Sequence, residues 1–219
     1  MKASFLGGAI VLLLAVGASS TPTGQTGPDL DKKVRAFLDG HAGRWYDMNV
    51  SEADGRILYD IIVKNKYTRA LEIGTSTGHS GIWIAWALSK TGGKLITVDI
   101  DEGRYREAVA NFREAGLAAY IDARLADAHD LVPALPGPFD FVFCDADKDW
   151  YKNYFVAALP KLTVGGVFTA HNVSSHMGRG GGWGSASFID YVLSLPFMET
   201  TFAEGSRAGL SVSYKRAEK

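Results

Sequence analysis

Acidic, basic and imidazole side chains gather at two places in this chain, each directly after an apolar run. The first is Asp145-Ala146-Asp147-Lys148, which follows the apolar residues 141–144, and the second is His171-Asn172. An aspartate, a histidine and an asparagine from neighbouring strand ends could bind one divalent ion, and a lysine beside them offers a base for removing a proton. Acids such as Asp147 also suit the start of a helix, but Asp145 falls at the end of the preceding strand.

A glycine turn indicates a bound nucleoside. Residues 70–78 read Ala-Leu-Glu-Ile-Gly-Thr-Ser-Thr-Gly, a strand followed by a turn and then by a helix that begins near His79. A second apolar run ends in Asp99, and an acid in this position accepts hydrogen bonds from ribose hydroxyls. Gly74 and Gly78 lie four residues apart rather than in the G-x-G-x-x-G pattern, which argues against NAD and favours another adenosine ligand. Without a ligand, the same turn would only connect a strand to a helix.

The elements that must position these residues alternate between strand and helix. Helical spacing covers residues 34–41 and 52–65, and the alternation that follows predicts a parallel sheet with helices on both faces. The expected strands are 69–74, 94–99, 120–125, 139–145 and 164–171, and the expected helices are 79–90, 103–116, 149–160 and 184–194. Two strand-like runs, 199–203 and 210–215, predict an antiparallel hairpin at one edge. The prolines at 133, 136 and 138 predict a loop before the fourth strand.

Polar groups are expected to converge at one edge of this sheet. Ligands of an open α/β sheet lie outside the carboxyl ends of its strands, so the residues that follow each strand define the candidate site. These residues are Gly74, Ser76, Gly78 and Ser80 after the first strand, Asp99 after the second, Asp127 and His129 after the third, Asp145, Asp147 and Lys148 after the fourth, and His171 and Asn172 after the fifth.

Composition limits the class of protein. The 219 residues are 47% hydrophobic and carry a formal net charge of -1, which suits one globular domain with a substantial core. A nearly neutral chain has no electrostatic footprint for nucleic acid. The single cysteine, Cys144, excludes an internal disulfide, and its apolar neighbours predict a buried side chain.

The N-terminal residues have the pattern of an export signal. Lys2 precedes an apolar run from Phe5 to Ala18 that ends in small residues, which is typical of a secretory signal peptide. A span of this length is short for a bilayer, so a cleaved signal at 1–18 is the prediction and a retained membrane anchor the alternative. Residues 19–30 are polar and linker-like, and the folded domain is expected over 31–219. The predicted location is therefore secreted or periplasmic.

Five short motifs, taken in order, resemble those of a known family. They are Met48-Asn49-Val50, Leu71-Glu72-Ile73-Gly74, Thr97-Val98-Asp99-Ile100-Asp101, Asp145-Ala146-Asp147-Lys148 and His171-Asn172-Val173. Over residues 44–216 the chain resembles the cation-dependent O-methyltransferases, the catechol and caffeoyl-CoA O-methyltransferase group. The resemblance implies the Rossmann-like class I methyltransferase fold, with a mostly parallel seven-stranded sheet and an antiparallel C-terminal edge. It also implies methyl transfer from S-adenosylmethionine to a hydroxyl of a small aromatic acceptor, in an enzyme that can be a homodimer.

The resemblance assigns roles residue by residue. Lys148 matches the catalytic lysine, and Asp145 matches a metal ligand that also borders the cofactor. In the cofactor site, Glu72 and Gly74 would hold the amino-acid end and Asp99 the ribose hydroxyls. The full set of implied cofactor contacts is Val50, Glu72, Gly74, Ser76, Ser80, Asp99, Ile100, Ala128, His129, Asp145 and Asp147.

His171 departs from the pattern of the family, in which an Asp-Asn pair usually stands at this point. Asp145, His171 and Asn172 would still offer three metal ligands, with one negative charge fewer. The family favours Mg²⁺, whereas imidazole favours Mn, Fe, Co, Ni or Zn, so we expect a shift toward transition metals. Two alternatives stay open: a metal-independent methyltransferase that uses His171 or Lys148 as base, and a secreted protein that binds ligands on this fold without catalysis.

Overall fold

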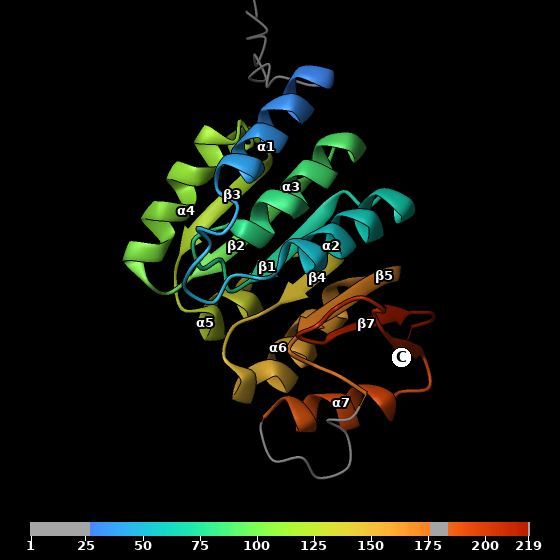
Figure 1. Ribbon diagram of the computed structural model, residues 1–219. Helices are drawn as coiled ribbons and strands as arrows, with labels where there is room; N and C mark the ends of the chain where they lie inside the picture. The colour runs from blue at the N-terminus through green and yellow to red at the C-terminus, as the bar shows by residue number, and fades with distance from the viewer. Residues whose placement is uncertain (1–26, 176–183, 219) are drawn as a thin grey trace, which may run out of the picture.

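One sheet of seven strands, in the order β3-β2-β1-β4-β5-β7-β6, organises the computed structural model, which describes residues 27–175 and 184–218 (Figure 1). The strands that pair in parallel are β1 (Arg69–Ile73), β2 (Lys94–Asp99), β3 (Ile121–Leu125), β4 (Phe139–Cys144) and β5 (Leu162–His171). The hairpin of β6 (Met198–Phe202) and β7 (Leu210–Lys215) is antiparallel, and β7 joins the sheet beside β5. The predicted fold, with its antiparallel C-terminal edge, is confirmed.

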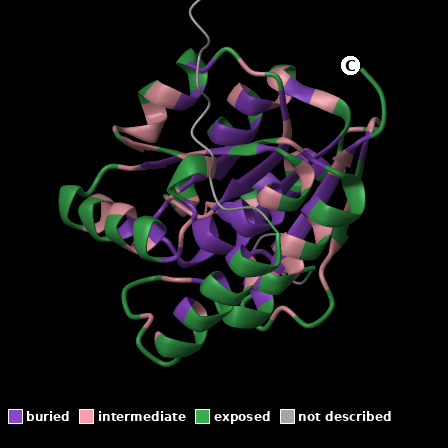
Figure 2. Ribbon diagram, turned by 90° about the horizontal axis from the view of Figure 1, so that it is seen from above, coloured by how far each residue is buried: buried purple, intermediate pink, exposed green. Residues whose placement is uncertain are grey.

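Helices cover both faces of this sheet. On one face lie α1 (Pro28–Gly40), α2 (Glu52–Asn65), α3 (His79–Thr91) and α4 (Glu102–Glu114); on the other lie α5 (Ala128–Ala134), α6 (Tyr151–Ala158) and α7 (Ser185–Leu193). Short 3-10 turns span Ala118–Tyr120, Lys148–Trp150 and Leu159–Lys161. The buried residues run along the sheet and the inner helix faces, while the outer helix faces are exposed (Figure 2). Burial of apolar side chains between these layers is the main force that holds the site in place.

Two elements differ from the sequence-based expectation. The proline-rich segment expected to be a loop before β4 contains the helix α5, which Asp127 caps by accepting a hydrogen bond from the backbone of His129. Pro133 lies inside this helix, where it removes one backbone hydrogen bond, and the helix ends one residue later at Ala134. The first helix begins at Pro28 and buries Leu30 completely, so residues 28–30 belong to a helix rather than to a linker.

The turn after β1 shows why glycine is needed at this point. Gly74 has φ +97°, and a Cβ atom there would lie 2.4 Å from the backbone oxygen of Asp145. Any side chain would therefore be strained in its backbone and would push β1 away from the end of β4. The absence of a side chain lets the ends of these two strands meet, which places Asp145 beside the turn.

The N-terminal assignments fall outside the described residues. The signal peptide or anchor at 1–18 and the linker as far as residue 26 remain predictions from the sequence. Among the helices of the described part of the chain, none is long and apolar enough to span a membrane.

Candidate active site

A cavity of about 770 Å³ opens at the carboxyl ends of the parallel strands. Most of the predicted site residues line it, namely Gly74, Ser76, Ser80, Asp99, Ile100, Ala128, His129, Asp145, Asp147, Lys148, His171 and Asn172. Asp127, also expected at the end of the third strand, lines it too. The remaining lining residues were not predicted as contacts: Met48, Asn49, Thr75, Val98, Arg104, Ala146 and Tyr154. The strand ends thus meet in one place, as the topology of an open sheet requires.

Two predicted residues, Val50 and Glu72, lie behind the cavity wall rather than on its surface. Val50 is buried, and its carbonyl oxygen accepts a hydrogen bond from His79 Nδ1 at 2.9 Å. Trp83 donates to the other ring nitrogen of His79, which leaves the proton on Nδ1. Val50 and Glu72 therefore form no part of the exposed cavity surface.

Glu72 is a fully buried carboxylate in the middle of β1. Its Oε2 atom accepts a hydrogen bond from Thr97 at 2.6 Å, while Oε1 has no hydrogen-bond partner among the described residues. Burial raises the pKa of this carboxyl to about 7, although hydrogen bonds from Ser80 and Thr97 act in the opposite direction. An unsatisfied buried acceptor is costly, and Ser80, a cavity residue, lies next to it.

Asp99 and the first turn of α3 form the other side of the glycine turn. The backbone N–H of Ser76 donates to Asp99 Oδ2 at 2.7 Å, and that of Asp101 donates to Oδ1 at 2.9 Å. Each carboxylate oxygen keeps a lone pair for a further donor. The N-cap of α3 is Gly78, which has no side chain to cap the helix. Asn49 Oδ1 accepts from the first N–H, that of His79, at 3.4 Å, and the next N–H groups of this turn are suited to an anion.

Asp145 and Lys148 form an ion pair on the floor of the cavity. Lys148 Nζ donates to Asp145 Oδ1 at 2.5 Å and to the hydroxyl of Tyr151 at 2.7 Å. Burial raises the pKa of Asp145, but the contacts with His171 and Lys148 outweigh this effect and leave the pKa lowered. Tyr151 in turn donates to the backbone oxygen of His171 at 3.1 Å, so one network ties the ends of β4 and β5 together.

His171 lies between two carboxylates, one of which the sequence analysis missed. Its Nδ1 atom is 3.0 Å from Asp145 Oδ2, and its Nε2 atom is 3.3 Å from Oδ2 of Asp54, a buried residue in the first turn of α2. Burial alone would lower the pKa of His171, but its contacts with Asp145 and Asp54 raise it to about 9. Asp54 is 117 positions away along the chain, and its place among other acids at a helix start gave no sign of this contact.

The aromatic and acidic residues after β3 and β4 form a third wall. His129 stacks on Trp150 with ring centroids 4.2 Å apart. Its two ring nitrogens lie 3.6 Å from Asp127 and 3.7 Å from Asp147. At the mouth of the cavity, Arg104 closes a bidentate contact with Asp47 at 2.6 and 2.8 Å. These contacts hold the loops that surround the opening.

The residues predicted as metal ligands share the cavity but do not form a dense acidic cluster. No three His, Cys, Asp or Glu side chains within the described ranges converge on one point. His171 Nδ1 is nevertheless buried without a hydrogen-bond partner in the described structure, because Asp145 Oδ2 lies close but is not aligned as an acceptor. A buried ring nitrogen next to a carboxylate oxygen, with Asn172 adjoining, is a set of side chains that suits a divalent ion once the ring is neutral.

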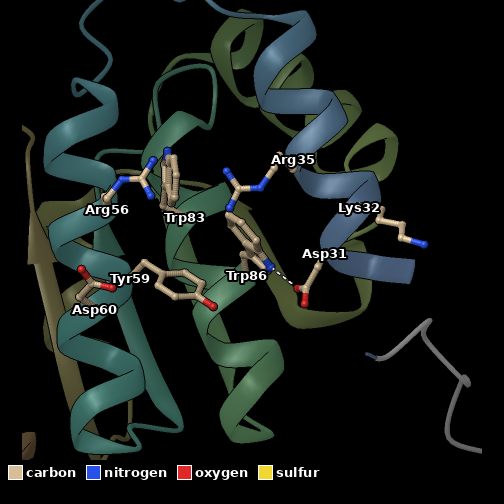
Figure 3. A pocket seen from close by; sticks show the side chains of 8 residues that line it. All are labelled: Asp31, Lys32, Arg35, Arg56, Tyr59, Asp60, Trp83 and Trp86. Carbon is tan, nitrogen blue, oxygen red and sulfur yellow. Dashed lines mark hydrogen bonds between the residues drawn. The ribbon is translucent and has the colours of Figure 1, made fainter. Parts of the chain in front are cut away.

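A second, smaller cavity of about 430 Å³ lies between α1, α2 and α3 (Figure 3). Arg35 lies over the Trp86 ring and Arg56 over the Trp83 ring, with guanidinium carbons 5.3 and 5.5 Å from the ring centroids. Trp86 Nε1 donates to Asp31 at 2.6 Å, and Lys90 pairs with the same carboxylate. None of the predicted site residues lines this cavity.

The fold and the larger cavity define an open α/β protein with its main cavity at the strand ends, beside the ion pair of Asp145 and Lys148. Residues 28–178 match the family model described as O-methyltransferase, and the chain belongs to that family. It is 38% identical over 130 residues to a catechol O-methyltransferase of Niastella koreensis, covering 58% of each chain. It is 32% identical over 150 residues to caffeoyl-CoA O-methyltransferase 1 of Eucalyptus globulus, covering 66% of this chain and 60% of that one.

A solved structure resembles the whole domain. An O-methyltransferase from Bacillus cereus in complex with SAH superposes with a TM-score of 0.70 at 26% identity, covering 84% of this chain and 91% of that one. The regions matched in the two curated relatives span only about 60% of their length. The chain therefore has the class I fold of this family.

Proposed function

We propose that this protein transfers a methyl group from S-adenosylmethionine to a hydroxyl of a small aromatic acceptor. One observation carries the proposal: a single cavity joins the glycine turn and Asp99, which suit an adenosine ligand, to the Asp145–Lys148 pair, which suits proton removal. The SAH in the Bacillus cereus structure supports the cofactor. The names of the catechol and caffeoyl-CoA relatives support a phenolic acceptor.

The cofactor would lie across the glycine turn. Glu72 Oε1, buried and without a partner in the described structure, would accept from the ammonium group of the cofactor, and the first turn of α3 would receive its carboxylate. Asp99 would accept from the ribose hydroxyls. The adenine would lie between Ile100 and the Ala128–His129 segment, all of which line the cavity.

Methyl transfer requires the protein mainly to align the acceptor oxygen with the methyl group of the cofactor. The acceptor oxygen forms a bond to the methyl carbon while the bond from that carbon to the sulfonium sulfur breaks, and the hydroxyl proton leaves. Holding both partners in line within one cavity removes much of the entropic cost of the reaction. We assign the proton to Lys148, whose Nζ lies in the cavity wall beside Asp145 and takes the proton when it is a neutral amine. Attack by a negative oxygen on a positive sulfonium neutralises both charges, so a site with little water favours it.

A divalent ion is part of the proposal and would be held by Asp145, His171 and Asn172. When bound, such an ion lowers the pKa of the acceptor hydroxyl and orients its oxygen. The family resemblance favours Mg²⁺, whereas the imidazole of His171 favours Mn, Fe, Ni or Zn. The unpaired Nδ1 atom of His171 supports the second choice.

The contacts of His171 also support a second candidate, methyl transfer without a metal. Both ring nitrogens face carboxylates, and a pKa of about 9 keeps the ring protonated at neutral pH. A protonated imidazole cannot accept a proton, so in this version the base is Lys148, acting in its neutral amine form rather than as the ammonium of the ion pair with Asp145. We further propose, from the signal pattern of residues 1–18 alone, that the protein is exported or anchored at a membrane.

Calorimetry with the purified protein tests the function. We expect S-adenosylmethionine to bind without metal, and catechol-type acceptors to be methylated once Mg²⁺, Mn²⁺, Ni²⁺ or Zn²⁺ is added. Activity that survives a strong chelator would favour the second candidate. Failure to bind the cofactor under every condition would contradict the proposal and leave a binding protein on a methyltransferase fold.

A further inference from the structure

We infer that Asp54 is a positioning residue, which holds the His171 ring so that Nδ1 faces Asp145 as a nitrogen ligand for a divalent transition-metal ion. The inference rests on the proposed function and deepens it, because it assigns a role to a residue outside the cavity lining. It also says which ring nitrogen carries the proton when the ion is bound. Asp54 and the ion would contact opposite nitrogens of one imidazole.

Asp54 is held rigidly in the position that this role requires. The hydroxyl of Ser51 donates to Asp54 Oδ2 at 2.7 Å, and the backbone N–H of Asp54 donates back to the same hydroxyl oxygen at 3.1 Å. The side chain of Asp54 is 1% exposed and that of His171 is 7% exposed. Two short local hydrogen bonds and almost complete burial leave this carboxylate little freedom to turn away from the ring.

Helix capping does not explain the carboxylate of Asp54. The N-cap of α2 is Ser51, whose side chain already accepts from the backbone of Asp54. The carboxylate therefore serves no cap of its own, and burying a charge that has no partner is costly. Its Oδ2 atom accepts from the hydroxyl of Ser51 at 2.7 Å and faces His171 Nε2 at 3.3 Å. An acceptor at Nε2 holds the proton of a neutral ring on that nitrogen and leaves the lone pair on Nδ1.

The Nδ1 atom stands where a metal ligand would stand. It is 3.0 Å from Asp145 Oδ2, yet within the described structure it makes no hydrogen bond. The other oxygen of Asp145 is occupied by Lys148, which leaves Oδ2 free for this side. A carboxylate behind a metal-binding histidine is a common arrangement that fixes the ring and its tautomer.

The competing interpretation is a protonated His171 that only neutralises Asp54 and Asp145. Both interpretations predict a stable contact between His171 and Asp54. Only the metal-binding one predicts that a nitrogen of His171 coordinates the ion directly. Electron spin echo spectroscopy of the protein stripped with a chelator and reloaded with Mn²⁺ alone distinguishes them. We expect ¹⁴N modulation from one imidazole and, by calorimetry, tighter binding of Mn²⁺ and Ni²⁺ than of Mg²⁺. Wild-type protein suffices for this measurement.

Two asparagine variants on the same helix then isolate the role of Asp54. Asp54→Asn should weaken Mn²⁺ binding about 10- to 100-fold and weaken the ¹⁴N modulation, whereas Asp60→Asn, an exposed change on α2, should leave both unchanged. His171→Asp should abolish the modulation and shift the preference toward Mg²⁺. Binding of SAH, measured in parallel, reports on the proposed function and on folding independently of the metal.

The inference is overturned by absence of ¹⁴N coupling in loaded wild-type protein. It is also overturned by an Asp54→Asn variant that binds SAH normally and retains the wild-type metal affinity and preference. Should SAH fail to bind wild-type protein while the ¹⁴N coupling is present, the proposed function would fail and the metal site would stand.

Discussion

The two cavities of this molecule differ in how their polar groups are satisfied. Between α1, α2 and α3, Asp31 accepts from Trp86 and Lys90, and two arginines cover two tryptophan rings (Figure 3). At the strand ends, Glu72 Oε1 and His171 Nδ1 are buried without hydrogen-bond partners among the described residues, as is Asp54 Oδ1 behind the ring. The first cavity is complete as it stands, and the second has polar groups for which a ligand would provide the partners.

This difference is a better guide to function than size or aromatic content. Tryptophans and arginines are typical of binding surfaces, but in the smaller cavity they bind one another. Buried polar atoms without partners cost free energy. Binding of a charged cofactor and an ion would supply partners for these atoms and so remove that cost. The following predictions test whether the contrast holds, from the largest expected effect to the smallest.

Replacing Lys148 should affect catalysis more than any other change discussed. Lys148→Met removes the proposed proton acceptor and should lower kcat about 10²- to 10⁴-fold, while SAH affinity changes only a few-fold. Steady-state kinetics and calorimetry check both values. The matched control is Lys152→Met, an exposed lysine four residues later at the start of α6, which should keep wild-type kinetics. Equal losses in the two variants would show that positive charge on this surface, rather than Lys148 itself, matters.

Neutralising Glu72 should stabilise the ligand-free protein at alkaline pH. Its pKa rises from 4.5 to about 7 in the fold, so the protonated carboxyl stabilises the fold below pH 4.5, and that contribution is lost as the pH rises through 7. At pH 8, Glu72→Gln should raise the free energy of unfolding by up to about 3 kcal/mol, with little change at pH 4. Thermal unfolding at both pH values measures this, with the exposed Glu107→Gln as control. A variant less stable than wild type at pH 8 would contradict the assignment of burial as the cause.

The same carboxyl should make cofactor binding depend on pH. The ammonium of the cofactor needs ionised Glu72, which must lose its proton below pH 7 before the ligand binds. SAH affinity should therefore fall about tenfold for each pH unit below 7, and Glu72→Gln should bind weakly with no such slope. Calorimetry between pH 5 and pH 8 checks both. A wild-type affinity that stays constant over this range would place the ammonium away from Glu72.

The sequence predicted the strand ends well because their signal is local. An apolar run followed by Gly74, Asp99 or Asp145 identifies a strand and its carboxyl end at once, and parallel topology then brings these ends together. Asp54 could not be found in this way, since its contact with His171 depends on how α2 packs against the end of β5. The helix α5 was missed for another reason: Pro133 indicated a loop, whereas the cap at Asp127 was the stronger signal.

The smallest effect is expected in the smaller cavity. Arg56 lies over Trp83 and is also paired with Glu52 on the surface of α2. Arg56→Gln should therefore cost about 0.5–1 kcal/mol of stability, and kcat, metal affinity and SAH affinity should all stay at wild-type values. Unfolding by urea measures the stability, and the kinetic and calorimetric assays described above measure kcat and the two affinities. Because the polar groups of this cavity already bind one another, a ligand there would have to displace arginine from tryptophan. A loss of activity or cofactor affinity in Arg56→Gln would thus show that satisfied polar groups do not mark a cavity as structural.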